Sequence, residues 1–160
     1  MTNIKEIAKY AQDFEIDLCL EVLNRFEGYL LNTCQEALEF VEQVNEPNVK
    51  IMLDTFHMNI EETSMISAIH LAGDKLGHFH VGEQNRLVPG KGSIPWHEIG
   101  LALKSINYQG NVVMEPFVLP FGQVAKDIKV WREMMPTIDE DALDLDAKRS
   151  LQFLKHVFGN

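Results

Sequence analysis

The chain has 160 residues, which is enough for one domain with a buried core, and no low-complexity segment or linker divides residues 1–160. Its formal net charge of −10 argues against nucleic acid and anionic membranes as partners, and no apolar run approaches the roughly 18 residues that cross a bilayer. The first residues lack the apolar segment of a secretory signal, and Cys19 and Cys34 form no disulfide framework. We therefore expect a single domain in a reducing cytoplasm.

Along the chain, apolar runs typical of strands alternate with amphipathic segments typical of helices. The predicted strands cover residues 16–22, 49–53, 76–81 and 110–117. The predicted helices cover residues 4–14, 32–45, 61–73, 95–107, 122–134 and 140–158. We expect Asn32 or Thr33 to cap the second helix and Gly73 to end the third. Trp96 and Trp131 fall at helical positions and are expected to pack in the core.

This alternation of strand and helix, repeated four times, predicts a parallel sheet covered by helices. Two architectures fit it, an open doubly wound sheet and part of a (β/α)8 barrel. No GxGxxG pattern follows a strand, so the dinucleotide-binding fingerprint is absent. The segment "PGKGS" lacks the first glycine of a phosphate-binding loop, so it does not indicate a nucleotide site.

Each predicted strand ends in a residue that can bind a metal. These residues are Glu21, Asp54, His80 and Glu115. Because the carboxyl ends of parallel strands lie on one face of the sheet, the four side chains are expected to meet there. The residue two positions before each one shares its strand face, which gives the inward set of a barrel. This second set is Cys19, Met52, His78 and Val113.

Three carboxylates brought together would repel one another and raise some of their pKa values, and a divalent cation would remove that repulsion. Three oxygen ligands and one imidazole suit Mn²⁺, Mg²⁺ or Co²⁺ better than a thiolate-preferring metal. Two or three coordination positions would remain for water or for a substrate with adjacent oxygens. A single acid at a strand end is more often a loop residue or a helix cap, but four in phase favour a metal site.

Five segments in the same order carry a resemblance to a known family. They are "EVLNRFEG", "VKIMLDTFHMNIEE", "LGHFHVGEQNR", "VPGKGSIPWHEIG" and "VVMEPFV". Together they resemble the D-tagatose 3-epimerase family, which includes the D-psicose (allulose) 3-epimerases. The resemblance implies a (β/α)8 barrel related to the xylose isomerases. It also implies epimerisation of ketohexoses at C3 with a divalent metal, Mn²⁺ before Mg²⁺ or Co²⁺.

The resemblance also assigns roles to individual residues. The family's metal ligands match Glu21, Asp54, His80 and Glu115, its two catalytic bases match Glu21 and Glu115, and its sugar-contacting residues match Glu27, His57 and Arg86. Two carboxylates on opposite sides of a sugar can remove the C3 proton on one face and return one on the other, and they exchange roles in the reverse reaction. Arg86 and His57 would hold the O1 to O3 region, and Glu27 would accept hydrogen bonds from sugar hydroxyls.

The chain departs from this family in length. A complete barrel needs about 250 residues, whereas four βα units match only the C-terminal half of the family. Four strands leave two open edges and an exposed inner face, so we expect a homo-oligomer or a complementing N-terminal half. A truncated product and a fragment of a longer protein stay open as well.

Two alternatives to an active ketose 3-epimerase follow from the missing half. The chain could be a metal-binding half-barrel without catalysis, or a related sugar isomerase or epimerase with another substrate. Endonuclease-like relatives of the same barrel are disfavoured by the negative net charge.

Overall fold

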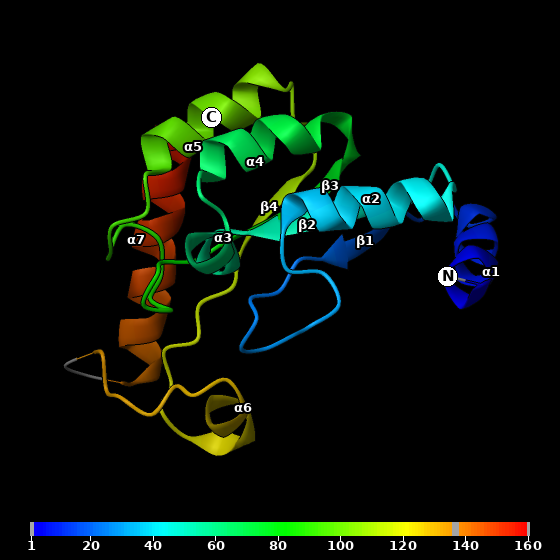
Figure 1. Ribbon diagram of the computed structural model, residues 1–160. Helices are drawn as coiled ribbons and strands as arrows, with labels where there is room; N and C mark the ends of the chain where they lie inside the picture. Colours follow the sequence, from blue (N-terminus) through cyan, green and yellow to red (C-terminus); the bar gives the residue numbers. More distant parts are fainter. Residues whose placement is uncertain (1, 136–137, 160) are drawn as a thin grey trace.

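A four-stranded parallel sheet forms the centre of the computed structural model, which describes residues 2–135 and 138–159. The strands pair in chain order, β1 (Leu18–Glu21), β2 (Val49–Asp54), β3 (Leu76–Val81) and β4 (Asn111–Met114). The helices are α1 (Thr2–Gln12), α2 (Cys34–Val44), α3 (Thr55–Glu61), α4 (Met65–Ala72), α5 (Trp96–Ser105), α6 (Gly122–Asp127) and α7 (Glu140–Phe158). Figure 1 shows α2, α4 and α5 on one side of the sheet. The predicted parallel βα arrangement is therefore confirmed.

The burial of β2 shows which face of the sheet the helices cover. Val49, Ile51 and Leu53 are fully buried beneath the helices, whereas Lys50 and Met52 between them are only half-buried. One face of the sheet therefore belongs to the hydrophobic core, and the other corresponds to the inner wall of a barrel. All four strands run in the same direction, so their carboxyl ends lie along one rim.

Local capping explains where several helices begin and end. Thr33, one of the two residues predicted to cap this helix, caps α2 in a capping box with Glu36. Gly73 ends α4 as predicted, with a backbone φ of 51°. The helix predicted over residues 61–73 is present as α4, but it begins later, at Met65, and the separate helix α3 before it was not predicted. Asp54 caps α3 directly after β2, and Ser64 caps a new helix.

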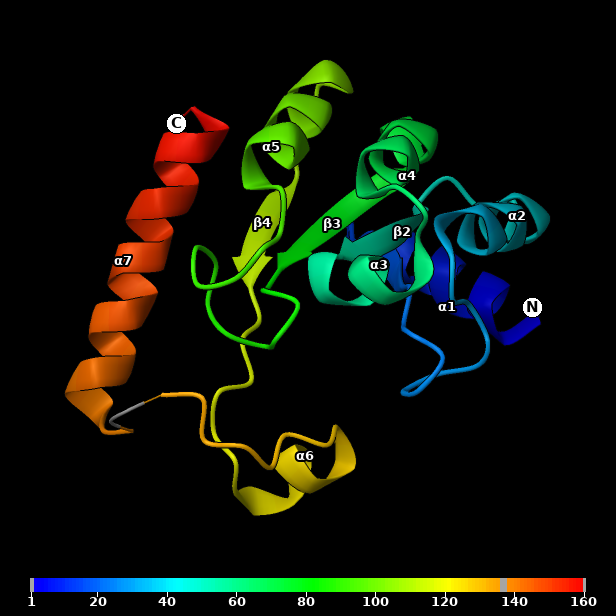
Figure 2. The ribbon, with the colours of Figure 1, turned by 60° about the vertical axis from the view of Figure 1, so that its left-hand side comes forward.

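The segment after β4 also differs from the prediction. The expected helix over residues 122–134 ends at Asp127, because Lys129 takes a left-handed backbone conformation with a φ of 65°. Trp131 consequently lies outside any helix and is 70% exposed, so its predicted place in the core is wrong. Trp96 is buried as predicted. Figure 2 shows α6 set apart from the sheet, while α7 stands beside α5.

Glu83 anchors the long loop between β3 and α5 from within the core. Its fully buried carboxylate accepts hydrogen bonds from the backbone N–H of Gly90 at 2.7 Å, from that of Ile94 at 3.2 Å and from Trp96 Nε1 at 2.7 Å. Three donors compensate for much of the cost of burying this charge. A Cβ at Gly92 would overlap the same carboxylate, so this position requires glycine.

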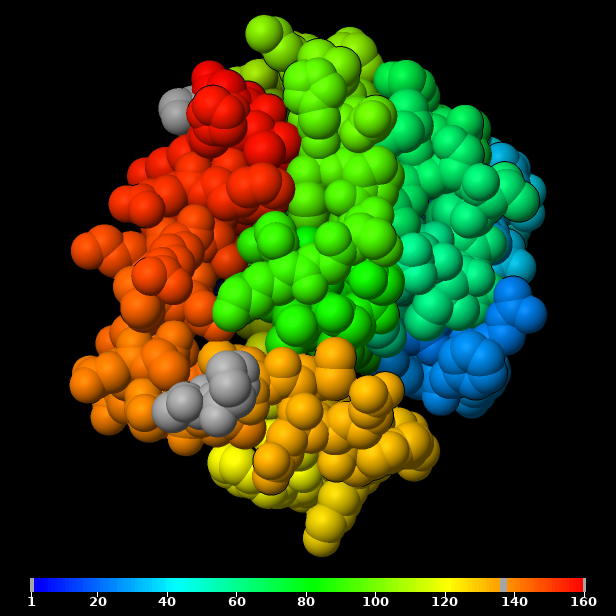
Figure 3. Space-filling model, turned by 90° about the vertical axis from the view of Figure 1, so that its left-hand side faces the viewer, coloured from blue at the N-terminus to red at the C-terminus, as the bar shows by residue number. Residues whose placement is uncertain are grey.

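Helix α7 holds the other side of this loop. Lys91 pairs with Asp146, and Ser150 Oγ donates to the carbonyl of Pro89 at 2.9 Å. Figure 3 shows the green loop lying against the orange part of α7. In the part of the chain that the structure describes, no helix is both long and apolar enough to cross a membrane. The cytoplasmic location stays a prediction.

The three hydrogen bonds to Glu83 predict the effect of replacing it. In Glu83→Gln, one acceptor oxygen becomes an NH₂ group that faces backbone donors, so the free energy of unfolding should fall by about 1–3 kcal/mol. Urea unfolding followed by circular dichroism measures this change. Glu42→Gln, on the exposed side of α2, is the matched control and should change stability little. Equal stability of the two variants would contradict the anchoring role.

Candidate metal centre

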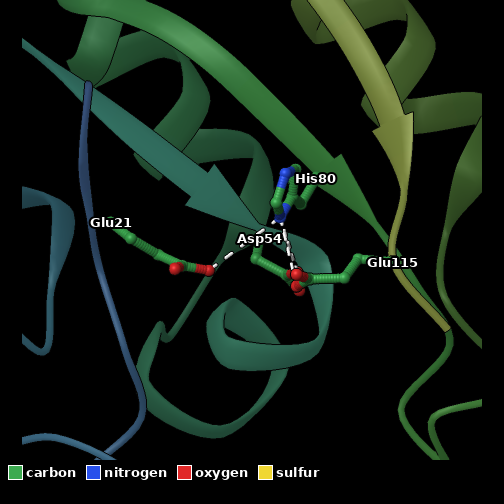
Figure 4. A group of neighbouring side chains, drawn as sticks. All are labelled: Glu21, Asp54, His80 and Glu115. Carbon is green, nitrogen blue, oxygen red and sulfur yellow. Dashed lines mark hydrogen bonds and ion pairs between the residues drawn. The ribbon is translucent and has the colours of Figure 1, made fainter. Parts of the chain in front are cut away.

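Four side chains from the carboxyl ends of four strands meet at the rim of the sheet. Glu21 is the last residue of β1, Asp54 is the last of β2, His80 lies near the end of β3, and Glu115 directly follows β4. One ligand atom from each of the four lies within 4.8 Å of every other. In Figure 4, Glu21 and Glu115 reach toward His80 from opposite sides. The structure thus brings together all four residues that strand phase singled out.

The imidazole of His80 is the centre of this cluster. Its Nδ1 lies 3.1 Å from Glu115 Oε2, 3.8 Å from Asp54 Oδ2 and 3.9 Å from Glu21 Oε1. These contacts leave one atom of each residue directed at a common point. A group of one imidazole nitrogen and three carboxylate oxygens is a ligand set that suits a hard or borderline divalent cation.

The electrostatics of the carboxylates favour a cation at this point. Burial raises the pKa of Asp54, and burial followed by the charges of Glu115 and Asp54 raises the pKa of Glu21. Both raised pKa values indicate that nearby positive charge does not offset the cost of ionising these two carboxyl groups. Asp54 uses Oδ1 to accept the backbone N–H of Phe56 at 2.6 Å, which leaves Oδ2 for an ion. The residues present therefore fit a divalent metal, which would remove the repulsion.

His57 connects this metal cluster to a second group of polar side chains. The backbone N–H of Asn24 donates to His57 Nδ1 at 3.2 Å, so the neutral ring carries its proton on Nε2. That Nε2 faces Glu21 Oε1 at 3.9 Å. Burial lowers the pKa of His57, which favours this neutral form. His57 therefore directs an N–H donor toward the rim of the metal cluster.

Arg86 and Glu27 form the far side of the second group. The guanidinium of Arg86 pairs with Glu27 and lies 3.5 Å over the ring of Phe56. Asn24 Nδ2 donates to the same carboxylate oxygen of Glu27 at 2.9 Å, so a continuous chain of polar contacts links Arg86 to His57. Arg86 Nε is buried and has no hydrogen-bond partner among the described residues. Asn24 and Glu27 therefore hold the Arg86 guanidinium in place and connect it to His57.

Sequence reasoning placed seven residues in the site but missed three that hold them in place. The structure places His57 beside Glu21 and links Glu27 and Arg86 to His57 through Asn24, although it does not test their roles. Those missed are Asn24, Phe56 and Glu83. Asn24 lies within "EVLNRFEG" and Phe56 within "DTFH", but an asparagine in a loop and a phenylalanine after a strand are too common to be singled out by residue type.

Comparison with known proteins gives this arrangement a family. Residues 1–138 match the family described as xylose isomerase-like TIM barrel. The chain belongs to this family. A match to this barrel family confirms the predicted fold class, and the four described strands are half of the eight that a TIM barrel contains.

Particular members of the xylose isomerase-like family are similar over nearly the whole chain. The D-psicose 3-epimerase of Enterocloster bolteae is 62% identical over 98% of this chain and 52% of its own length. That of Agrobacterium fabrum is 57% identical over 98% of this chain and 54% of its own. A crystal structure of D-psicose 3-epimerase in the presence of D-fructose superimposes with a TM-score of 0.96 at 57% identity, covering 98% of this chain and 54% of the other.

The chain therefore spans about half the length of the curated relatives that it matches. These matches confirm the resemblance predicted from the five sequence segments. They also agree with the site, because all four residues of the metal cluster lie within the matched family segment.

Replacing Asp54 separates metal binding from folding. In Asp54→Asn, the side chain keeps a helix-capping oxygen for α3 but loses its charge, so Mn²⁺ affinity should fall at least about tenfold. Without metal, the free energy of unfolding should rise, because a buried carboxylate with a raised pKa is destabilising when ionised. Titration calorimetry with Mn²⁺ and urea unfolding in chelator measure the two effects.

The control for this variant is Glu39→Gln, which removes a carboxylate from α2, away from the strand rim. It should leave Mn²⁺ affinity unchanged. Equal Mn²⁺ affinity of Asp54→Asn and the unaltered chain would exclude Asp54 from the metal site.

Proposed function

We propose that the chain carries the catalytic half of a metal-dependent ketose 3-epimerase. The proposed substrates are ketohexoses such as D-tagatose, D-psicose and D-fructose, and the proposed metal is Mn²⁺, with Mg²⁺ and Co²⁺ as alternatives. The observation that carries the proposal is the placement of Glu21 at the end of the first strand and of Glu115 directly after the last, on opposite sides of His80. The names of the similar proteins, including D-psicose 3-epimerase, support it.

Inversion at C3 needs one base on each face of the sugar. The C3 proton lies next to the C2 ketone and is only weakly acidic, so its removal leaves negative charge on adjacent oxygens. A divalent cation, when bound, supplies electrostatic stabilisation of such charge. Glu21 removes the proton from one face and Glu115 returns one to the other, and the two exchange roles in the reverse reaction.

The environment of Glu21 suits this work. Burial and neighbouring carboxylates raise its pKa, which makes its ionised form a stronger base than an exposed glutamate. Glu21 remains partly accessible, because 30% of its side chain is exposed. Glu115 is similarly open, with 37% of its side chain exposed. Both carboxylates can therefore reach a ligand that lies over the strand rim.

The second polar group would position the sugar. His57 offers Nε2–H beside Glu21, and Arg86 offers a planar set of donors for the O1 to O3 oxygens. Glu27 accepts from Asn24 and Arg86 on one oxygen, which leaves its other oxygen for a sugar hydroxyl. A fixed constellation of this kind lowers the entropy lost when the substrate reaches the reacting geometry.

Deuterium exchange at C3 tests the proposal directly. This chain is incubated in D₂O with Mn²⁺ and D-fructose or D-psicose, alone and with the half of the Enterocloster bolteae enzyme that it does not match, and C3 deuteration is followed by NMR. Exchange should appear in the combined sample and fall at least about 100-fold in Glu115→Gln. Glu39→Gln should keep the full rate.

Absence of exchange in both samples, with Mn²⁺ bound to this chain, would reject the ketose 3-epimerase function. A non-catalytic metal-binding half-barrel and a related sugar isomerase or epimerase with another substrate would then be the remaining functions. Exchange that persists in Glu115→Gln would instead remove Glu115 from the mechanism.

A further inference from the structure

Both edge strands of the sheet have backbone groups that point away from it. The N–H of Leu18 donates to Asn48 at 2.8 Å and that of Val22 to Met52 at 3.1 Å, so both face β2. Because successive residues of a strand alternate, the backbone groups of Cys19 and Glu21 face the open edge of β1. Pairing along this edge would therefore act on the backbone of a metal-cluster residue.

The opposite edge of the sheet, formed by β4, also has outward-facing backbone groups. The N–H of Glu115 donates to Val81 at 3.3 Å, so the backbone groups of Val112 and Met114 face outward. The side chains of Val112 and Val113 are exposed as well. Unpaired strand edges of this kind are templates for pairing with further strands.

Helix α1 lies beyond the open edge of β1, over a position that no described strand occupies. In a βα repeat each helix follows a strand and covers the groove beside it, but α1 precedes β1 and follows no strand among the described residues. Figure 1 shows it at the margin of the sheet, beyond β1. Ala8 is buried, and its carbonyl accepts from Asn48, whereas Tyr10 is 68% exposed and Phe14 is 59% exposed. The apolar side chains of Tyr10, on α1, and of Phe14, just after it, are therefore largely uncovered.

The apolar surface continues along β1 toward the strand rim. A hollow of about 610 Å³ is lined mainly by apolar side chains of α1, β1, α2 and the loop after β1. Among these are Ile4, Leu20 and Phe40, together with Tyr29, which is 88% exposed. A contiguous exposed patch of this kind marks an interaction surface in a folded protein.

We propose that the open edges of β1 and β4, with the exposed face of α1, dock an N-terminal half-barrel that ends in a strand. The last strand of that half pairs with β1 beneath α1, and its first strand pairs with β4. The lengths of the relatives support this occupant, because this chain covers only 52–54% of each D-psicose 3-epimerase. In this arrangement the N-terminal half supplies the strand that lies beneath α1.

A second copy of this chain fits the same edges less well for two reasons. The β4 of the second copy would pair with β1 of the first and would bring its own α7, which follows β4. That helix would compete with α1 of the first copy for the groove between the two strands. The second copy would also place three more carboxylates at the same barrel mouth, opposite Glu21, Asp54 and Glu115. Like charges that close together are strongly unfavourable. An N-terminal half that ends in a strand avoids the first conflict, because α1 then covers that strand.

Co-expression tests this docking without relying on catalysis. The half of the Enterocloster bolteae D-psicose 3-epimerase that this chain does not match carries an affinity tag and is expressed together with this chain. The two should co-purify as a 1:1 complex by light scattering. Hydrogen exchange of the backbone N–H groups of Cys19, Glu21, Val112 and Met114 should slow in the complex.

The double variant Tyr10→Glu and Phe14→Glu should weaken the complex at least about tenfold, because it places charges on the exposed aromatic pair at the end of α1. Leu71→Glu, an exposed apolar residue on α4, is the matched control and should bind normally. Failure to recover the two chains together, or a symmetric dimer of this chain that excludes the tagged half, would overturn the proposal. A complex that forms without C3 exchange would leave docking intact and reject the proposed function.

Discussion

The convergence of three carboxylates on the imidazole of His80 is the constraint on which the site depends. Four parallel strands end at one rim, and each delivers a polar side chain to the same point. Burial makes the charges of Asp54 and Glu21 costly, and this raises their pKa values. A protein gains little stability from such a group alone, so the arrangement is best explained by a cation that binds there.

The surroundings of the cluster keep its shape without adding ligands. The N–H of Phe56 holds one oxygen of Asp54, and Asn24 fixes the tautomer of His57. Arg86 lies over Phe56 and pairs with Glu27, and it belongs to a loop that Glu83 anchors from within the core. Hydrogen bonds beyond the ligands orient a metal site and set its chemistry, so these residues matter as much as the ligands do.

The sequence predicted the strands and the convergence of four polar residues at the strand rim well, because both depend on local patterns. Buried strands are apolar runs, and parallel strands must end on one face, so Glu21, Asp54, His80 and Glu115 could be found by their phase alone. The break between α3 and α4 and the early end of α6 were missed. The break depends on the capping side chains of Asp54 and Ser64, and the early end depends on the backbone conformation of Lys129. The hydrophobic periodicity of the sequence reveals neither. Asn24, Phe56 and Glu83 were missed because their importance comes from tertiary contacts.

Diffraction from crystals soaked in Mn²⁺ tests the central claim most directly, since the ion scatters anomalously and can be placed without assumption. One anomalous peak should appear at the strand rim, with one atom each from Glu21, Asp54, His80 and Glu115 in its coordination shell. A well-ordered rim without a peak, or an ion bound by fewer than these four residues, would contradict it.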